Sequence, residues 1–181
     1  MRGRRMTIVN RYLPALVSSA ILAATLILAS SVSAQPLNGV QPVGSTTLRV
    51  FFFRIYDSTL YSPNGEYQGI EPGLTLVIDY NRNIPARELI ARTQEEWRAQ
   101  SLFDTENEQW LVELQTLWPD INKGDSLTVE ATEDLGSRFY FNGEVIGEIN
   151  NSRFTEEFLA IWLSPDSSYP EQRRELVGLD R

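Results

Sequence analysis

The hydrophobic period of this chain changes three times, and the order of those changes constrains its fold more than any other feature. β-branched and aromatic residues typical of strands fill residues 48–61 and 74–80, and a helical period follows in residues 84–118. Strand alternation returns in residues 126–149, and a helical period begins again at residue 152. Runs of strands and runs of helices in this order are typical of α+β proteins, in which an antiparallel sheet packs its helices on one face. We therefore predict an α+β domain and not a doubly wound fold.

The strand signals vary in strength along the chain. Residues 48–61 (LRVFFFRIYDSTLY) indicate either a pair of strands or one bent strand, followed by a turn at Asn64-Gly65. The Asn142-Gly143 dipeptide lies between two alternating runs and is the strongest hairpin signal in the chain. The remaining strands are expected at Leu74–Tyr80, Ser126–Glu133, Ser137–Phe141 and Glu144–Ile149.

The helical segments carry start and stop signals. Asn83 is the expected N-cap of a helix over residues 84–100, and Thr105-Glu106-Asn107-Glu108 has the pattern of a capping box for a second helix that ends at Pro119. Two further helices are expected at Ser152–Leu163 and Pro170–Val177. The four tryptophans lie at apolar helical spacing, which favours core packing. The adjacent pairs Glu95-Glu96 and Glu156-Glu157 are interpreted as solvated helix faces.

Residues 1–34 have the pattern of a cleavable secretory signal. Four arginines and no acidic residue accompany an apolar run over residues 13–29, and the small residues Val32 and Ala34 stand where signal peptidase requires them. The alternative is an uncleaved membrane anchor, but the run is at the short limit for spanning and contains Pro14. We expect cleavage before Gln35 and a single periplasmic or secreted domain over residues 35–181.

The charge of that domain excludes several partners. All 24 acidic residues follow residue 34, whereas four of the 16 basic residues precede it, which leaves 12 basic residues and a formal charge of −12. Such a surface repels phosphate backbones and anionic headgroups. We therefore expect no nucleic-acid partner, and contact with the membrane only through the signal segment before cleavage.

Missing residue types exclude several kinds of catalysis. The chain has no cysteine and no histidine, and both methionines lie within residues 1–34. A thiol nucleophile, a Ser–His pair, a histidine-ligated zinc site and axial ligation of haem by His or Met are therefore excluded. We expect no metal and no cofactor, and any proton chemistry would depend on carboxylates, tyrosine, arginine or Lys123.

The order and spacing of several strings resemble the chalcone isomerase-like family, in particular its exported bacterial branch. The resemblance covers residues 40–178 and is carried by VGSTTLRVFFFRIYDSTLYSP, EEWRAQ, WPDINKGDSLTV, FYFNGEVIGEI and FLAIWLSP. It implies an open-faced β-sandwich, a long antiparallel sheet with helices on one face and a ligand cleft between them. Members range from plant enzymes that close a chalcone into a flavanone to fatty-acid-binding proteins and non-catalytic homologues.

The resemblance does not carry the catalytic residues of the plant enzymes over to this chain. Those enzymes use an arginine to polarise the substrate, and a threonine and a tyrosine to organise a water molecule. Aligned on Leu60-Tyr61, Tyr56 takes the position of the threonine, Gly44 that of the arginine, and Ala86 lies near that of the tyrosine. We therefore expect no catalytic residue and no chalcone cyclisation.

The candidate ligand-binding residues are Arg54, Tyr56, Arg49 and Tyr61. Arg54 and Tyr56 are two residues apart, so strand alternation predicts that they share a face. An arginine there could hold a carboxylate with its two-pronged guanidinium. The alternative is that Arg54 is a solvated residue on the outer face of the sheet.

Three functions remain open at this point. The first is a non-catalytic periplasmic binding protein for a lipophilic carboxylate such as a fatty acid, with the helix faces that carry Trp97 and Trp110 as walls of the cleft. The second is an isomerase or intramolecular lyase of the chalcone isomerase type that uses Tyr and Arg. The third is a protein-interaction scaffold without a ligand.

Overall fold

The computed structural model describes residues 37–180. The predicted signal segment and its cleavage site lie outside the described residues. Within residues 37–180, no helix combines the length and the apolar character that crossing a membrane requires.

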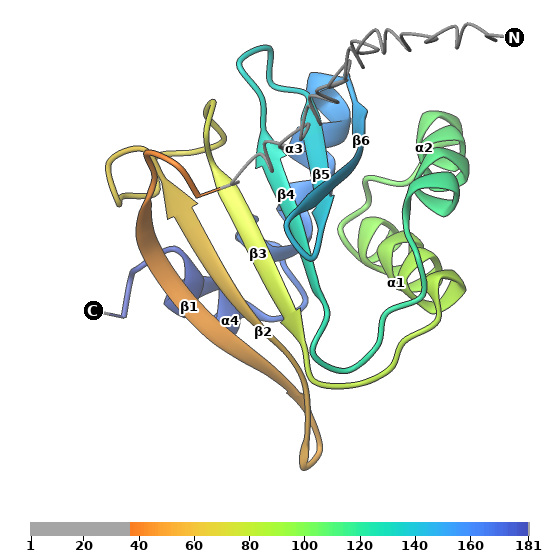
Figure 1. Cartoon of the computed structure of the whole chain (residues 1–181), viewed down its shortest axis with the longest axis horizontal. Helices are drawn as coiled ribbons and strands as arrows, with labels where there is room; N and C mark the ends of the chain where they lie inside the picture. The colour runs from red at the N-terminus through yellow and green to blue at the C-terminus, as the bar shows by residue number, and fades with distance from the viewer. Residues whose placement is uncertain (1–36, 181) are drawn as a thin grey trace, which may run out of the picture. The chain divides into compact units, whose positions relative to one another are not determined.

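In the part of the chain that the structure describes, six strands form one antiparallel sheet in which the order in space follows the order in sequence (Figure 1). This arrangement confirms the predicted α+β class and the antiparallel sheet. The strands are β1 (Gln41–Val50), β2 (Phe53–Ser62), β3 (Thr75–Tyr80), β4 (Ser126–Ala131), β5 (Ser137–Phe141) and β6 (Glu144–Ile149).

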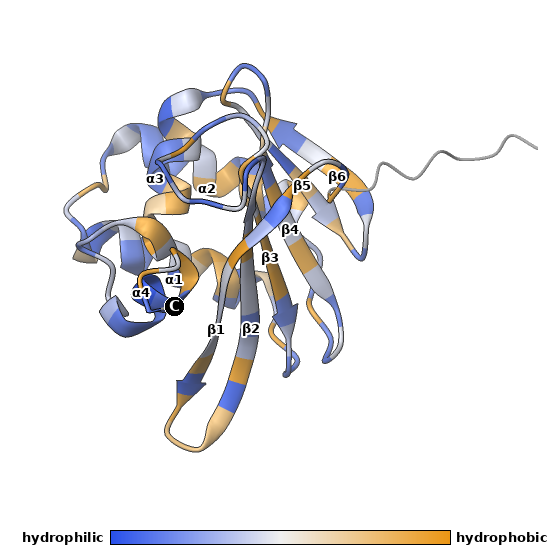
Figure 2. Ribbon diagram, turned by 90° about the vertical axis from the view of Figure 1, so that its left-hand side faces the viewer, coloured by the Kyte–Doolittle hydropathy of each residue, from blue (hydrophilic) through white to orange (hydrophobic). Residues whose placement is uncertain are grey.

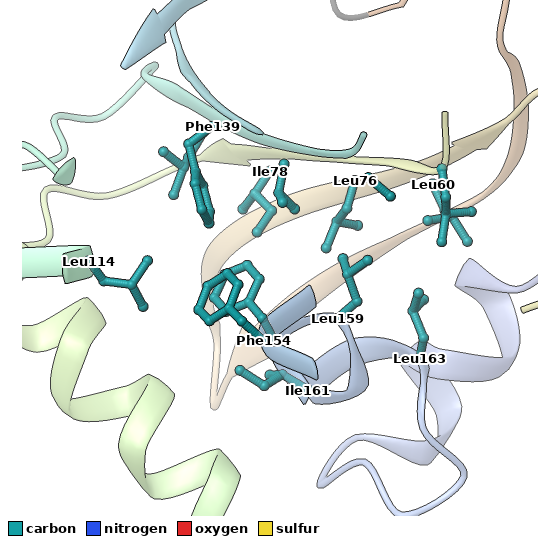
Figure 3. Close-up of a cluster of buried hydrophobic side chains, with 14 of the residues drawn as sticks. Leu60, Leu76, Ile78, Leu114, Phe139, Phe154, Leu159, Ile161 and Leu163 are labelled. Carbon is teal, nitrogen blue, oxygen red and sulfur yellow. The ribbon is translucent and has the colours of Figure 1, made fainter. Parts of the chain in front are cut away.

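Within residues 37–180, four helices lie on one face of the sheet (Figure 2). They are α1 (Ala86–Ala99), α2 (Thr105–Leu117), α3 (Ser152–Leu163) and α4 (Pro170–Leu176). Figure 3 shows how Phe139, Ile78 and Leu76 of the sheet point toward Phe154 and Leu159 of α3. These side chains are at most 3% exposed, so the core lies between the sheet and α3.

The first two helices begin differently from the prediction. Asn83 is not the N-cap of α1, because its side chain accepts a hydrogen bond from the Lys123 amide at 2.8 Å. The helix begins after Pro85, and the Ala86 amide donates to Asp120 Oδ1 at 2.8 Å. The loop that follows α2 therefore satisfies the free amide at the start of α1.

The capping box of α2 lies one residue before the predicted position. Asp104 is the N-cap, and its carboxylate accepts hydrogen bonds from the amides of Glu106 and Asn107. The Asn107 side chain accepts one from the Asp104 amide at 2.7 Å. The same asparagine donates to Glu157 on α3 at 2.6 Å, so the cap also joins two helices.

Residues 48–61 form a pair of strands, and the turn between them is Phe51-Phe52. Leu48 pairs with Tyr56 but Arg49 pairs with Arg54, so Ile55 is an extra residue in β2. An extra residue of this kind is a β-bulge, which interrupts the alternation of side chains between the two faces. Bulges also insert one residue in each edge strand, Val43 in β1 and Ile146 in β6.

Candidate functional site

A cavity of about 510 Å³ lies between the sheet and helices α1 and α3. Strands β1 to β4 supply one wall, α1 and α3 supply the opposite wall, and Trp118 and Tyr169 come from the loops. Most of its lining is apolar, and this volume is within the range of small-molecule sites. The aliphatic and phenyl side chains in the lining are Leu48, Val50, Ile55, Ile78, Ile84, Leu89, Leu127, Phe158 and Ile161.

Arg92 of α1 is the one arginine or lysine that lines this cavity within residues 37–180. Its Nη2 lies 2.5 Å from Glu96 Oε1 and donates a hydrogen bond to the Tyr169 hydroxyl at 2.7 Å. Its Nη1 donates to Glu95 at 2.9 Å. Burial lowers the pKa of Arg92, but its contacts with Glu95, Glu96 and Tyr169 outweigh that effect and raise it. The guanidinium therefore remains a fixed positive charge.

Glu96 is buried, which corrects the interpretation of the Glu95-Glu96 pair as a solvated face. The residue is 2% exposed and lines the cavity, whereas the Glu95 side chain is 62% exposed. The second carboxylate oxygen of Glu96 accepts a hydrogen bond from Ser168 at 2.6 Å. Glu157 also departs from that interpretation, because its side chain is 11% exposed and contacts Arg153 and Asn107.

Tyr56 is the one predicted ligand-binding residue that lines the cavity. Its hydroxyl accepts a hydrogen bond from Trp162 Nε1 at 2.9 Å. Within residues 37–180 nothing accepts the hydroxyl proton of Tyr56, so the group can donate to a ligand. Burial raises the pKa of Tyr56, and likewise that of Tyr80 beside it. Both hydroxyls are therefore neutral donors and not bases.

Arg54 lies outside the cavity, and the prediction that it shares a face with Tyr56 is wrong. The bulge at Ile55 reverses the alternation, so Arg54 points to the same outer face as Asp57. The two side chains form an ion pair at 2.6 Å. Although burial opposes the shift, hydrogen bonds from Arg54, Thr47 and Asn81 lower the pKa of Asp57 to about 2. Arg54 is therefore held by a carboxylate of the chain itself.

The other predicted residues also lie away from the cavity. Arg49 is exposed and pairs across the hairpin with Arg54, and Tyr61 is a half-buried residue opposite Pro42. Trp97 and Trp110 are buried against Phe154 and do not line the cavity. Trp118 and Trp162 supply the indole walls instead.

The position that the resemblance aligns with the catalytic arginine has no room for a side chain. A Cβ on Gly44 would collide with the backbone carbonyl oxygen of Glu175 and would lie 2.6 Å from that of Leu176. An arginine there would displace α4. Ala86, aligned near the catalytic tyrosine, is the first residue of α1 and does not line the cavity.

The comparisons with known proteins agree with this architecture. A model of the chalcone isomerase-like family matches residues 37–178. The chain belongs to this family. An uncharacterized protein of Haemophilus influenzae is 30% identical to this chalcone isomerase-like chain over 146 residues, which cover 81% of the chain and 72% of the relative.

A crystal structure with the same fold is that of a fatty-acid binding protein of Arabidopsis thaliana. The TM-score is 0.58, with 78% of this chain and 88% of the plant protein covered. At 10% sequence identity, the likeness shows the chalcone isomerase-like fold and nothing finer.

The sequence contains a signal for the two charged residues that the predictions missed. Glu96 follows Leu89 by seven residues and Thr93 by three, which places it on the apolar stripe of α1. Arg92 lies four residues before Glu96, within reach of its carboxylate. Charged residues are uncommon on the apolar face of a helix, so the Arg92–Glu96 pair indicates a candidate functional site.

Proposed function

We propose that this chalcone isomerase-like protein binds a lipophilic carboxylate, such as a fatty acid, in the cavity between the sheet and α1 and α3. The observation that carries the proposal is the distribution of polarity in the lining. Apolar side chains from β1 to β4 face those from α3, while the charged lining residues, Arg92 with Glu88 and Glu96, all belong to α1. An elongated apolar ligand with one anionic end matches that distribution.

The tail of the ligand provides most of the affinity in this proposal. Each methylene group that leaves water contributes about 0.8 kcal/mol. Leu48, Ile78 and Phe158 are among the side chains that would contact it. The cavity volume lies within the roughly 300–1,000 Å³ typical of ligand sites.

Arg92 holds the headgroup in this proposal, and Tyr56 donates a hydrogen bond from the opposite wall. Glu96 is buried and fixes one side of the guanidinium, whereas Glu95 on its other side is exposed. An ion pair between exposed side chains is worth about 0–1 kcal/mol, so a ligand carboxylate can replace Glu95 at small cost. A fatty alcohol has neither the negative charge nor the second acceptor oxygen that would pair with the guanidinium.

Residues 1–34 have the pattern of a signal peptide, which supports a periplasmic or secreted location for this binding. An intact mass of the exported protein that lacks those residues is the expected result. A mass that retains them would contradict the proposed location, but not the proposed ligand.

Titration of a fatty acid and its matching alcohol tests the binding proposal. Arg92→Ala should weaken acid binding by about tenfold and leave alcohol binding unchanged, because it removes one charge-assisted hydrogen bond at a half-exposed site. Arg87→Ala, an exposed arginine on the same helix, is the matched control.

Arg54→Ala distinguishes the assignment of the headgroup to Arg92 from the sequence-based assignment to Arg54. We expect no change, because Arg54 is bound to Asp57 on the outer face. Equal affinity of the wild type for acid and alcohol would contradict the headgroup assignment. Binding of neither ligand would contradict the proposed function as a whole.

One observation favours the isomerase or lyase as a second candidate function. Glu96 is a buried carboxylate in the cavity lining, beside Arg92 and near the Tyr169 hydroxyl, and could transfer a proton within a bound ligand. Mass spectrometry and NMR of a lipophilic ligand incubated with the wild type and Glu96→Gln test this. A rearranged product that the variant fails to form would favour catalysis over binding.

A further inference from the structure

The turn of the β1–β2 hairpin exposes a continuous group of apolar side chains, which we call the phenylalanine tip and define as residues 50–53. Phe51 is 90% exposed, Phe52 97% and Phe53 64%, and Val50 beside them is 43% exposed. The hairpin extends beyond the rest of the sheet, and its tip is apolar (Figures 1 and 2). Three adjacent exposed phenylalanines indicate a surface with a partner, because soluble proteins rarely display such a cluster.

The backbone of the turn supports a role for these side chains beyond folding. Phe51 has a φ of 54°, in the left-handed region that glycine and asparagine occupy most easily. The chain uses Asn142-Gly143 for its β5–β6 hairpin, with φ of 51° and 85°. At the β1–β2 turn it has two phenylalanines instead, so large apolar groups are present where turn geometry disfavours them.

Arginine side chains lie close to the tip. Between residues 35 and 56 the sequence contains Arg49 and Arg54 and no acidic residue, whereas all 24 acidic residues follow. Arg82, from the loop after β3, lies over the Phe53 ring at 5.5 Å. Arg54 pairs with Asp57, while Arg49 and Arg82 form no ion pair within residues 37–180.

The tip is continuous with the wall of the ligand cavity. Val50 belongs to the tip and also lines the cavity, and so does Ile55 just beyond it on β2. A surface that contacted the tip would therefore lie beside residues that a lipophilic ligand contacts.

We propose that the phenylalanine tip inserts into the interface of an anionic lipid bilayer, with Arg49 and Arg82 at the level of the headgroups. Apolar side chains enter the boundary of the acyl chains while flanking arginines remain with the phosphates. This binding replaces the expectation that the membrane is contacted only through the signal segment. It goes beyond the proposed function and does not depend on the identity of the ligand.

The small area of the tip favours a bilayer over a protein. The three phenylalanines offer roughly 500 Å² of accessible surface for burial. Each partner in a standard protein interface contributes about 800 Å². Insertion into a bilayer has no such minimum, because its affinity increases with each residue that enters. At about 0.1 M salt, interactions between exposed charges more than about 10 Å apart are largely screened, so the arginines at the tip act on the nearby lipid more than acidic residues beyond that distance do.

Flotation with lipid vesicles tests the proposal, with protein purified from cells that express the full chain so that all variants share one N-terminus. One vesicle is an equal mixture of phosphatidylethanolamine and phosphatidylglycerol, and the other is phosphatidylcholine alone. Combined replacement Phe51→Ser and Phe52→Ser should reduce partitioning to both vesicles by about a hundredfold, at about tenfold for each side chain. Combined Arg49→Gln and Arg82→Gln should reduce it by about tenfold or more on the anionic vesicle only.

A single fluorescent label reports which part of the domain contacts the lipid. Because the chain contains no cysteine, Phe52→Cys takes a thiol-reactive, polarity-sensitive dye at one position. Its emission should shift to the blue with anionic vesicles. The same dye at Asp134→Cys, an exposed position in the loop after β4 at the other end of the sheet, should not respond.

Two outcomes would overturn the proposal. One is equal partitioning of the wild type and the double phenylalanine variant. The other is a wild-type dimer that this variant abolishes, which would assign the tip to a second copy of the chain. Titration of a fatty acid in solution distinguishes a failure of this proposal from a failure of the proposed function, because the tip variant should bind the acid as the wild type does.

Discussion

At the scale of single residues, Gly44 shows how the fold excludes one chemistry. The strand β1 passes so close to the end of α4 that the hydrogen atom of a glycine is all that fits beside the carbonyl oxygens of Glu175 and Leu176. Thr46, two residues further along β1, donates a hydrogen bond to the Glu175 side chain. The site of a potential substrate-binding side chain is thus occupied by helix backbone.

Gly44→Ala should therefore lower the free energy of unfolding by about 1–3 kcal/mol, the usual cost of overpacking a tight site. Urea denaturation of the two proteins measures the difference. The neighbouring change Ser45→Ala, at an exposed position of the same strand, should stay within about 0.5 kcal/mol of the wild type. An equal effect of both changes would show that α4 moves away freely.

At the scale of elements, the sequence predicts the strands and helices well but not the faces of β2 and α1. Alternation and turn residues are local properties, so the hairpin at Asn142-Gly143 and the helix over residues 152–163 are confirmed. The bulge at Ile55 depends on how two strands pair, which no local pattern contains. For this reason strand alternation wrongly predicts that Arg54 faces the cavity. Glu96 is a separate case, because its spacing from Leu89 places it on the apolar stripe of α1.

The polar contacts that join α2 to α3 give a test at the same scale. Asn107 is fully buried, and its side chain accepts one hydrogen bond from the Asp104 amide and donates another to Glu157. Asn107→Ala should lower the free energy of unfolding by about 2 kcal/mol, at about 1 kcal/mol for each hydrogen bond. Thr105→Ala, exposed at the start of the same helix, serves as the control in thermal denaturation. A cost no larger than that of Thr105→Ala would contradict this account of the cap.

At the scale of the whole molecule, the negative charge is unevenly distributed along the sequence. The domain from residue 35 has a formal charge of −12, yet the segment from residue 35 to residue 56 contains two arginines and no acid. The acidic remainder repels anions over distances longer than the cavity itself. In the proposed function, the lining arginine therefore attracts a carboxylate against the field of the acidic residues.

Higher ionic strength should for this reason tighten the binding of a fatty acid. Screening shortens the range of the repulsion, while the contact with Arg92 at close distance is affected less. The ratio of acid to alcohol affinity should rise severalfold between low and high salt, as calorimetry would measure it. The alcohol corrects for the general effect of salt on apolar ligands, and a ratio that falls with salt would contradict the argument.

The bulges in the two edge strands have a consequence for how copies of this protein meet one another. An unpaired strand edge is a template on which a second chain can add its own strand, and this is how many sheets begin to aggregate. Here Val43 in β1 and Ile146 in β6 each insert one residue into an edge, and Pro42 removes a backbone donor beside the first. Within residues 37–180, both edge strands therefore carry a bulge that interrupts the row of hydrogen-bonding groups on which intermolecular β-pairing depends.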